Sequence, residues 1–205
     1  DGIKIIKNKY WDIAFSRRFL SPDSRLSMGG AIKELDKRLS EAVKVRLVSD
    51  VPLGVFLSGG IDSSAIAYYA QKNSLSKIKT FSIGFKDESF DESKHARQVA
   101  SFLGTEHHEK LLTAKDSLDF IPRVANLLDE PMADASIIPA YLLSNFTKQK
   151  VTVALGGDGG DEIFCGYDTF AAERLAGAYE RIPDFFRKNI IEKIVPFLPT
   201  SFNNI

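Results

Sequence analysis

Cysteine is almost absent from the 205-residue sequence: Cys165 is the single one, so no disulfide can form within the chain. Long apolar runs are absent as well, because the longest fall far short of the roughly 20 residues that cross a bilayer. Neither sign of charge is in excess, since 27 acidic side chains balance 27 basic ones. Without a positive excess, neither nucleic acid nor an anionic membrane is expected as the main partner. No apolar signal segment follows the first lysines, so the sequence predicts a cytoplasmic protein.

The length suits a single domain, with two small ones as the alternative. A domain of this size buries roughly 70% of the surface of its unfolded chain, so it can fold without disulfides or a structural metal. Residues 1–25 are basic and irregular, which indicates an interdomain linker, and residues 26–205 are expected to form the domain. The abrupt start at Asp1 and the unmarked end suggest a piece cut from a longer protein.

Short apolar runs alternate with segments of helical spacing along most of the chain. Strands are expected at residues 51–57, 79–85, 106–112 and 151–155, and helices at 28–49, 61–73, 116–128 and 136–148. Another helix is expected to contain Ala96 and Leu103, with Ser89 and Glu92 as a capping box and Gly104 as its stop. The tail from residue 168 has helical spacing, broken by prolines. This alternation predicts an α/β fold, a parallel sheet of about five strands flanked by helices.

Two of these strands end in glycine-rich loops. In open parallel sheets, ligands bind beyond the carboxyl ends of the strands, near a topological switch point. Both loops should therefore lie on one edge of the sheet and contribute to one site.

The first loop follows the strand at 51–57 and consists of Ser58, Gly59, Gly60, Ile61, Asp62, Ser63 and Ser64. Its glycines permit a sharp turn into a helix, whose first N–H groups and dipole attract an anion. Its serines add hydroxyl donors, so phosphate is the favoured ligand. The spacing fits neither a Walker P-loop nor a dinucleotide fingerprint. Asp62 would repel phosphate unless a divalent cation bridges the two, which predicts Mg²⁺.

The second loop follows the strand at 151–155 and consists of Gly156, Gly157, Asp158, Gly159, Gly160, Asp161 and Glu162. The glycines again allow close approach of the backbone, and the acids again require a metal beside a nucleotide. We expect Asp161 to join Asp62 around Mg²⁺. For either loop taken alone, a simple turn that caps a helix is the alternative.

The first loop resembles the pyrophosphate-binding loop of the N-type ATP pyrophosphatases, which cleave ATP to AMP and pyrophosphate. Residues 155–167 resemble the second signature of the glutamine-hydrolysing asparagine synthetases. The segment Asp129-Glu130-Pro131 with Ser136, Pro139 and Tyr141 is similar to the connecting helix of that family, and Tyr10-Trp11-Asp12 is similar to the link that leaves its glutaminase domain. The resemblance covers almost the whole chain, with the motifs in the family's order.

The resemblance implies a fold like the adenine nucleotide alpha hydrolases, with ATP and Mg²⁺ bound. Leu57 and Ile83 would contact the adenosine, Gly156 and Gly157 would line the nucleotide, and residues 58–64 would hold the pyrophosphate. Asp62 and Asp161 would hold Mg²⁺. Asp158 falls where the family forms its aspartyl-adenylate; many members have Glu there, so the shorter Asp changes the reach of this side chain.

The implied reaction activates the side-chain carboxylate of aspartate as an adenylate, which ammonia then converts to asparagine. The implied partners are aspartate, ammonia released from glutamine, and a glutaminase domain of the same parent chain; a homodimer is left open. Because the family's domain continues beyond residue 205, we expect this chain to bind Mg·ATP weakly without completing the reaction. The alternatives are another adenylating enzyme on the same scaffold, such as a β-lactam synthetase, a lasso-peptide cyclase or an amidotransferase of surface-sugar biosynthesis, or a non-catalytic nucleotide-binding module.

Other candidate residues favour structural roles. His107 and His108 are neighbours on a strand and point to opposite faces, so a shared metal ion is not expected. His95 is expected to be solvated, and Cys165 is interpreted as a small packing residue.

Overall fold

The computed structural model describes residues 6–10, 27–85, 92–130, 132, 134 and 136–195. Its four strands are β1 (Leu53–Phe56), β2 (Lys79–Phe85), β3 (Glu106–Leu112) and β4 (Val153–Leu155). They form one parallel sheet with the order β3-β2-β1-β4. The predicted α/β class with a parallel sheet is confirmed, with four strands in the described part of the chain where about five were expected.

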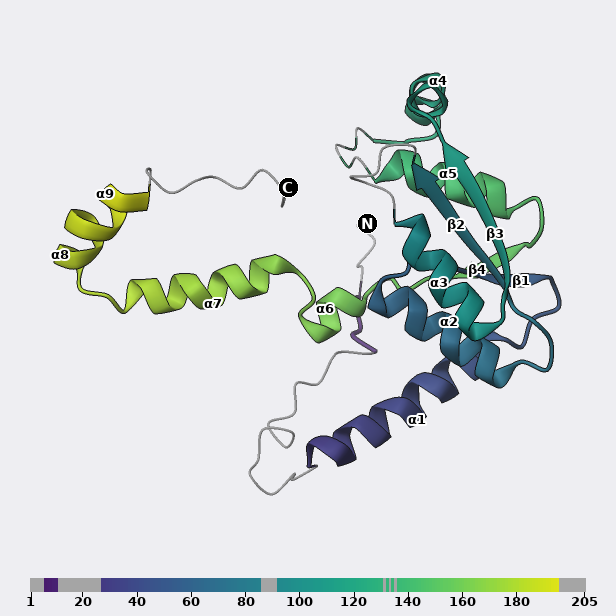
Figure 1. The fold of residues 1–205 in the computed structure, drawn as a ribbon, viewed down its shortest axis with the longest axis horizontal. Helices are drawn as coiled ribbons and strands as arrows, with labels where there is room; N and C mark the ends of the chain where they lie inside the picture. The colour runs from purple at the N-terminus through teal and green to yellow at the C-terminus, as the bar shows by residue number, and fades with distance from the viewer. Residues whose placement is uncertain are drawn as a thin grey trace.

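The helices are α1 (Met28–Arg46), α2 (Ile61–Asn73), α3 (Ser93–Leu103), α4 (Ala114–Ala125), α5 (Ile137–Thr147), α6 (Gly160–Phe164), α7 (Asp168–Glu180), α8 (Asp184–Phe186), η3 (Arg187–Ile191) and α9 (Glu192–Ile194). Helix α2 packs on β1, and α3 packs on β2 and β3. Helix α5 contacts β2, and Phe146 of α5 meets Phe81 edge to face. Helix α1 covers α2, and α4 covers α5 (Figure 1).

The two faces of the sheet carry different side chains. The core on the α2 and α3 side of the sheet, to which α1 adds Val43, consists of Val43, Val55, Leu57, Ala67, Tyr69, Ala70, Ile78, Ala96 and Ala100. Neighbouring residues of β2 alternate between the faces: Thr80 bonds to His107 on the α3 side, whereas Phe81 packs toward α5. Both residues have no exposed surface, as expected for a central parallel strand covered on both faces.

The predicted boundaries of α2, β2 and β3 agree with the structure. Helix α4 begins earlier than expected because Thr113 and Asp116 form a capping box, in which Asp116 Oδ2 accepts from the Thr113 N–H at 2.7 Å. Gly104 ends α3 in the left-handed conformation, at φ 69°, as predicted. Of the capping box expected before α3, Ser89 lies outside the described residues; α3 begins at Ser93, with Glu92 as an N-cap that makes no side-chain cap bond.

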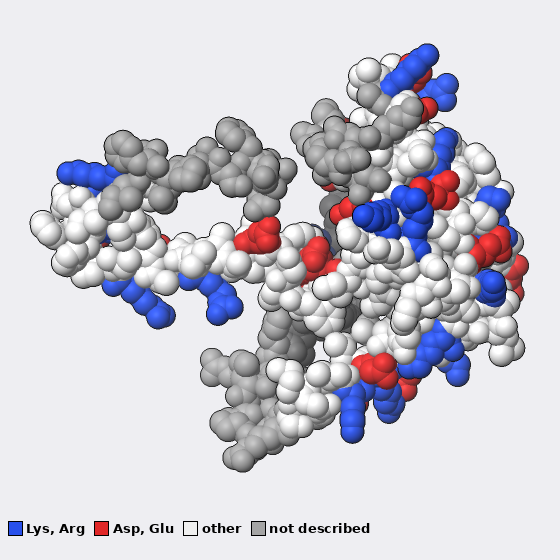
Figure 2. Space-filling view, in the orientation of Figure 1, with Lys and Arg blue, Asp and Glu red and all other residues white. Residues whose placement is uncertain are grey.

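Beyond the second loop, α6 leads into an arm formed by α7 to α9, which extends away from the sheet (Figure 1). Residues 6–10 have no regular secondary structure, and the rest of the predicted linker lies outside the described residues, as do Trp11, Asp12 and Pro131. Figure 2 shows Lys and Arg mixed with Asp and Glu on the face in view, consistent with a net charge of zero. No helix in the described ranges is both long and apolar enough to cross a membrane.

Candidate functional site

The two glycine-rich loops meet at the carboxyl edge of the sheet. β1 and β4 are hydrogen-bonded neighbours, with Val55 opposite Leu155, so their loops emerge side by side. The chain places β2 on one side of β1 and β4 on the other, which makes the β1–β4 boundary a topological switch point. A Cβ on Gly157 would lie 2.8 Å from the Ser63 amide nitrogen. The expectation that both loops lie on one edge of the sheet is confirmed.

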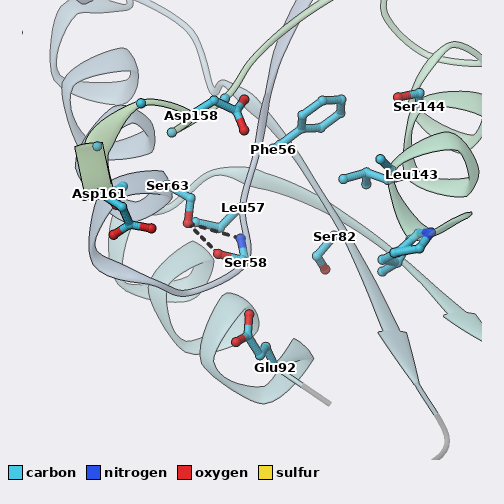
Figure 3. Close-up of a pocket in the computed structure, with 18 of the residues that line it drawn as sticks. Phe56, Leu57, Ser58, Ser63, Ser82, Glu92, Leu143, Ser144, Asp158 and Asp161 are labelled. Atoms are coloured by element: carbon cyan, nitrogen blue, oxygen red, sulfur yellow. Dashed lines mark hydrogen bonds between the residues drawn. The ribbon is translucent and has the colours of Figure 1, made fainter. Parts of the chain in front are cut away.

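Hydrogen bonds within the first loop fix its shape. The Ser63 hydroxyl donates to the Gly60 carbonyl at 3.2 Å. Ser63 Oγ also accepts from the Ser58 amide at 3.2 Å (Figure 3). Since a hydroxyl has one proton, the 2.9 Å contact between Ser58 Oγ and Ser63 Oγ is donated by Ser58. The Gly60 amide in turn donates to Ser58 Oγ at 3.2 Å. Both hydroxyl protons are thus used inside the loop.

Gly59 gives this loop its turn. Its φ of 91° lies in the left-handed region, and a Cβ there would come within 2.6 Å of His95 Cβ at the start of α3. The turn aims the first N–H groups of α2, which have no partner within the helix, beyond the edge of the sheet. Ser64 Oγ is buried and has no hydrogen-bond partner among the described residues. The loop therefore offers backbone donors, as an anion cradle requires, more than serine hydroxyl protons.

A cavity of about 610 Å³ opens between the two loops, the ends of β1 and β2, the start of α3, and α5. Of the predicted site residues, those that line it are Leu57, Ser58, Asp62, Ser63, Ile83, Gly156, Gly157, Asp158 and Asp161. Gly59, Gly60 and Ser64 belong to the same loop but are not part of the lining. Figure 3 shows Asp158 and Asp161 on the side of Ser58 and Ser63, with Leu143 and Ser144 across from them.

Several lining residues were not predicted from the sequence as site residues: Phe56, Ser82, Phe85, Glu92, Ser93, Ala140, Leu143, Ser144, Glu162 and Tyr167. Those from α5 form a mostly apolar wall, with Ser144 as its polar member, and the place of this wall depends on tertiary packing. Glu162 and Tyr167 lie within the second signature, so the signature itself was the available signal. The Tyr167 hydroxyl donates to Glu162 Oε1 at 2.7 Å, and this bond lowers the pKa of the Glu162 carboxyl.

The cavity is strongly acidic. Five of its lining residues are carboxylates: Asp62, Glu92, Asp158, Asp161 and Glu162. Among the described lining residues there is no Lys or Arg. A phosphate-bearing ligand would be repelled here unless cations accompany it.

Asp62 and Asp161 both line the cavity and are the residues that would hold Mg²⁺ if a bound ligand completed the site. An added Cβ on Gly160 would come within 2.6 Å of Asp62 Oδ2, so the Asp62 carboxylate lies against the turn that leads to Asp161. Within the described residues, no cluster of three or more His, Cys, Asp or Glu could hold a metal on its own. Mg²⁺ is commonly held by one or two carboxylates together with substrate phosphates and water, so a site with two carboxylates would need a ligand to complete it.

The remaining sequence predictions have mixed outcomes. His107 bonds to Thr80 on the α3 face, whereas His108 stacks on Phe81 and bonds to Glu106 at 2.9 Å, so the two imidazoles do point to opposite faces. His95 is exposed, as expected. The interpretation of Cys165 as a packing residue is wrong: it is exposed and ends α6 at φ 59°.

Residues 34–200 match the family model described as asparagine synthase. Asparagine synthetase [glutamine-hydrolyzing] 1 of Bacillus subtilis is 38% identical over 160 residues, which are 78% of this chain and 25% of that protein. Putative asparagine synthetase [glutamine-hydrolyzing] 2 of Methanocaldococcus jannaschii is 40% identical over 190 residues, which are 91% of this chain and 35% of that protein. The chain thus spans about a quarter to a third of the length of these relatives.

A weaker likeness is found among solved structures. The NH3-dependent NAD synthetase from Campylobacter jejuni aligns with a TM-score of 0.46 and 17% sequence identity, covering 66% of this chain and 60% of that one.

Proposed function

Because this chain belongs to the asparagine synthase family, we propose that it forms the ATP-binding site of an ATP-dependent, amide-forming ligase. The observation that carries this proposal is the junction of the two loops, where Gly157 lies against Ser63 and the Asp62 carboxylate against Gly160. It joins a backbone anion cradle to a pair of carboxylates suited to Mg²⁺. In finer detail, we propose that the ligase activates the side-chain carboxylate of aspartate as an adenylate and converts it to asparagine.

The residues of the cavity divide between the two ends of the nucleotide. Leu57 and Ile83, which lie on the β1 and β2 side of the cavity, would contact the nucleoside. The Ser58 loop and the first turn of α2 would hold the phosphates. Asp62 and Asp161 would hold Mg²⁺, which would neutralise phosphate charge in this acidic cavity.

The reaction has two steps that this site can support. A carboxylate oxygen of aspartate attacks the α-phosphorus of ATP, and the bond to pyrophosphate breaks. The N–H groups of α2 face the charge that develops on the departing pyrophosphate, a form of electrostatic stabilisation that exists before the reaction. Ammonia then attacks the activated carbonyl carbon, AMP leaves, and the nitrogen loses a proton to solvent.

Asp158 is proposed to act on the activated carboxylate. It is exposed at the cavity edge, and its carboxylate folds back over Gly156, where a Cβ would strike Asp158 Oδ2. This position is within the second loop but separate from the Asp62 and Asp161 pair. Ammonia is proposed to come from glutamine through a glutaminase domain, because both relatives are named glutamine-hydrolysing and this chain spans only part of each.

The test of the reaction is exchange of labelled pyrophosphate into ATP with Mg²⁺, with aspartate compared with glutamate and other carboxylates. Exchange that depends on aspartate supports the proposal. Exchange with a different carboxylate would keep the ligase class and refute asparagine synthesis.

The test of the metal pair is the affinity for Mg·ATP of Asp62→Asn and Asp161→Asn, measured by calorimetry. Each is expected to weaken binding at least tenfold, because each removes a charge that holds the cation. Asp50→Asn is the matched control, since Asp50 is exposed and outside the cavity lining. Unchanged affinity in both site variants would contradict this assignment.

A further inference from the structure

A chain of hydrogen bonds runs from the backbone of α3 to the wall of the cavity. Thr105 Oγ1 lies 3.4 Å from the carbonyl oxygen of Ala100 and 2.9 Å from Thr80 Oγ1. Thr80 Oγ1 lies 2.9 Å from His107 Nδ1, and His107 Nε2 lies 3.2 Å from Ser82 Oγ. Thr80 and Ser82 are buried, and Ser82 lines the cavity. This series of hydrogen bonds thus links a fixed acceptor, the Ala100 carbonyl, to the Ser82 hydroxyl at the cavity wall.

These bonds can all form at once in a single direction. A carbonyl accepts, so the Thr105 hydroxyl donates to Ala100, and Thr105 then has no proton for Thr80. Thr80 must therefore donate to Thr105, and its oxygen must accept from His107. This order places a proton on His107 Nδ1. In a neutral imidazole the other nitrogen, Nε2, is then an acceptor, and Ser82 must donate to it.

The surroundings of His107 favour the neutral ring. Burial, followed by the nearby His108 and Arg97, lowers the pKa of His107 below its ordinary value of 6.5. The Glu109 carboxylate lies 3.9 Å from His107 Nε2 and acts in the opposite sense, but Arg97 lies 3.2 Å from the same oxygen and offsets it. The lowered pKa favours the neutral ring, and in a neutral ring the bonds above set the direction of the whole hydrogen-bond chain.

We propose that His107 is a positioning residue: its Nε2 accepts a hydrogen bond from the Ser82 hydroxyl, so Ser82 can only accept from a ligand and selects a donor group of the bound nucleoside. Ser82 Oγ has no other side-chain partner among the described residues, so its lone pairs are available to the cavity. It precedes Ile83, and Figure 3 shows it on the cavity wall between Ser58 and Leu143. The adenine amino group and the ribose hydroxyls are the donors that a nucleoside offers. This inference rests on the proposed function, in that the cavity takes a nucleotide.

The first experiment determines which ring nitrogen of His107 carries the proton, in the absence of any ligand. The chain has three histidines, so ¹⁵N-detected ring spectra can be assigned with His95→Gln and His108→Gln variants. At pH 7, Nδ1 of His107 is expected to carry the proton and Nε2 to be unprotonated. A proton on Nε2 at that pH would overturn the inference, because Ser82 could then donate to a ligand.

The second experiment asks whether Ser82 meets a donor. The Kd values of Mg·ATP, its 2′-deoxy and 3′-deoxy forms and Mg·ITP, which lacks the amino group, are compared in wild type and in Ser82→Ala. One donor-lacking analogue is expected to bind wild type about three- to tenfold more weakly than ATP, and this difference is expected to vanish in Ser82→Ala. Ser101→Ala, at an exposed serine of α3, is the control that should keep it.

The outcomes separate this inference from the proposed function. Equal analogue discrimination in wild type and Ser82→Ala would overturn the selection of a donor. Failure of wild type to bind Mg·ATP would refute the nucleotide function, and with it the donor selection. The ring spectra would then still decide whether His107 Nε2 accepts a hydrogen bond from the Ser82 hydroxyl.

Discussion

At the residue scale, Gly157 determines how closely the two loops approach. A Cβ at this position would lie 2.8 Å from the Ser63 nitrogen and 3.0 Å from the Asp62 carbonyl carbon, which are backbone atoms that cannot rotate away. Gly157→Ala is therefore expected to force the loops apart, to weaken Mg·ATP binding at least tenfold, and to destabilise the fold by about 1–3 kcal/mol. Calorimetry and thermal unfolding measure the two effects.

Gly177→Ala is the matched control, because nothing lies within 4 Å of a Cβ at Gly177 in α7. This change should leave nucleotide affinity unaltered and should stabilise the helix slightly, since alanine is the better helix former. If Gly157→Ala bound Mg·ATP as wild type does, the contact between the loops would not matter for the site.

The half-buried imidazole of His107 should make the free energy of unfolding depend on pH in the mildly acidic range. Its pKa is lowered in the folded protein, so the unfolded chain binds the proton more readily. As pH falls below 6.5, the unfolded state gains more protons, and the free energy of unfolding should fall. Denaturant titrations from pH 7.5 to pH 5 test this. His107→Gln should flatten the dependence, whereas His95→Gln, at an exposed position, should keep it; a profile unchanged by His107→Gln would count against the argument.

The site residues that could be predicted from sequence are those in contiguous motifs. The residues of the two loops carry their chemistry in adjacent positions, so motif spacing could predict that many of them line one cavity. Ser82 was missed because a serine within a strand gives no local signal, and its role depends on His107, 25 residues away. Cys165 was misjudged because the short helix α6 ends in a left-handed turn that leaves it outside the core.

At the scale of elements, α1 and α2 are joined by a polar bond beside their apolar contact. The Tyr69 hydroxyl donates to Asp36 Oδ1 at 2.9 Å, and burial followed by this bond raises the pKa of Tyr69 from its ordinary 10.0 to about 12. Between these values the unfolded chain loses a proton that the folded one keeps, so the free energy of unfolding should fall as pH rises from 10 to 12. Tyr69→Phe should reduce the fall in the free energy of unfolding between pH 10 and 12, and denaturant titrations at these pH values would measure it.

Tyr68→Phe is the control, because Tyr68 is the adjacent tyrosine and 42% exposed. It should leave the slope of stability against pH unchanged. An equal effect of the two substitutions would show that the bond to Asp36 is not the cause.

The elements themselves were largely predictable, because their boundaries are local. Helix α2 begins directly after Gly60, and α3 ends at Gly104, where the required backbone favours glycine. The start of α4 was missed although Thr113 and Asp116 have the spacing of a capping box. The order of the strands was not predictable, because pairing of β1 with β4 joins residues about 100 positions apart and is decided by packing.

At the scale of the whole molecule, the sheet and the α7 arm differ in how much they bury. Within the described residues, α2 and α7 have 13 residues each, but α2 buries Ala67, Tyr69 and Ala70, whereas α7 buries none. A helix of about this length is marginal in water without tertiary packing. The arm is therefore expected to open locally at much lower free energy than the sheet and its covering helices.

Hydrogen exchange followed by mass spectrometry on the whole chain tests this expectation, with α2 as the matched internal reference for α7. Amides of α7 should exchange at least a hundredfold faster than those of α2, and β1 and β2 should be among the slowest. Equal protection would mean that something covers α7 in solution. A second copy of the chain would make that protection rise with protein concentration, whereas contact within one chain would not, so a dilution series distinguishes the two.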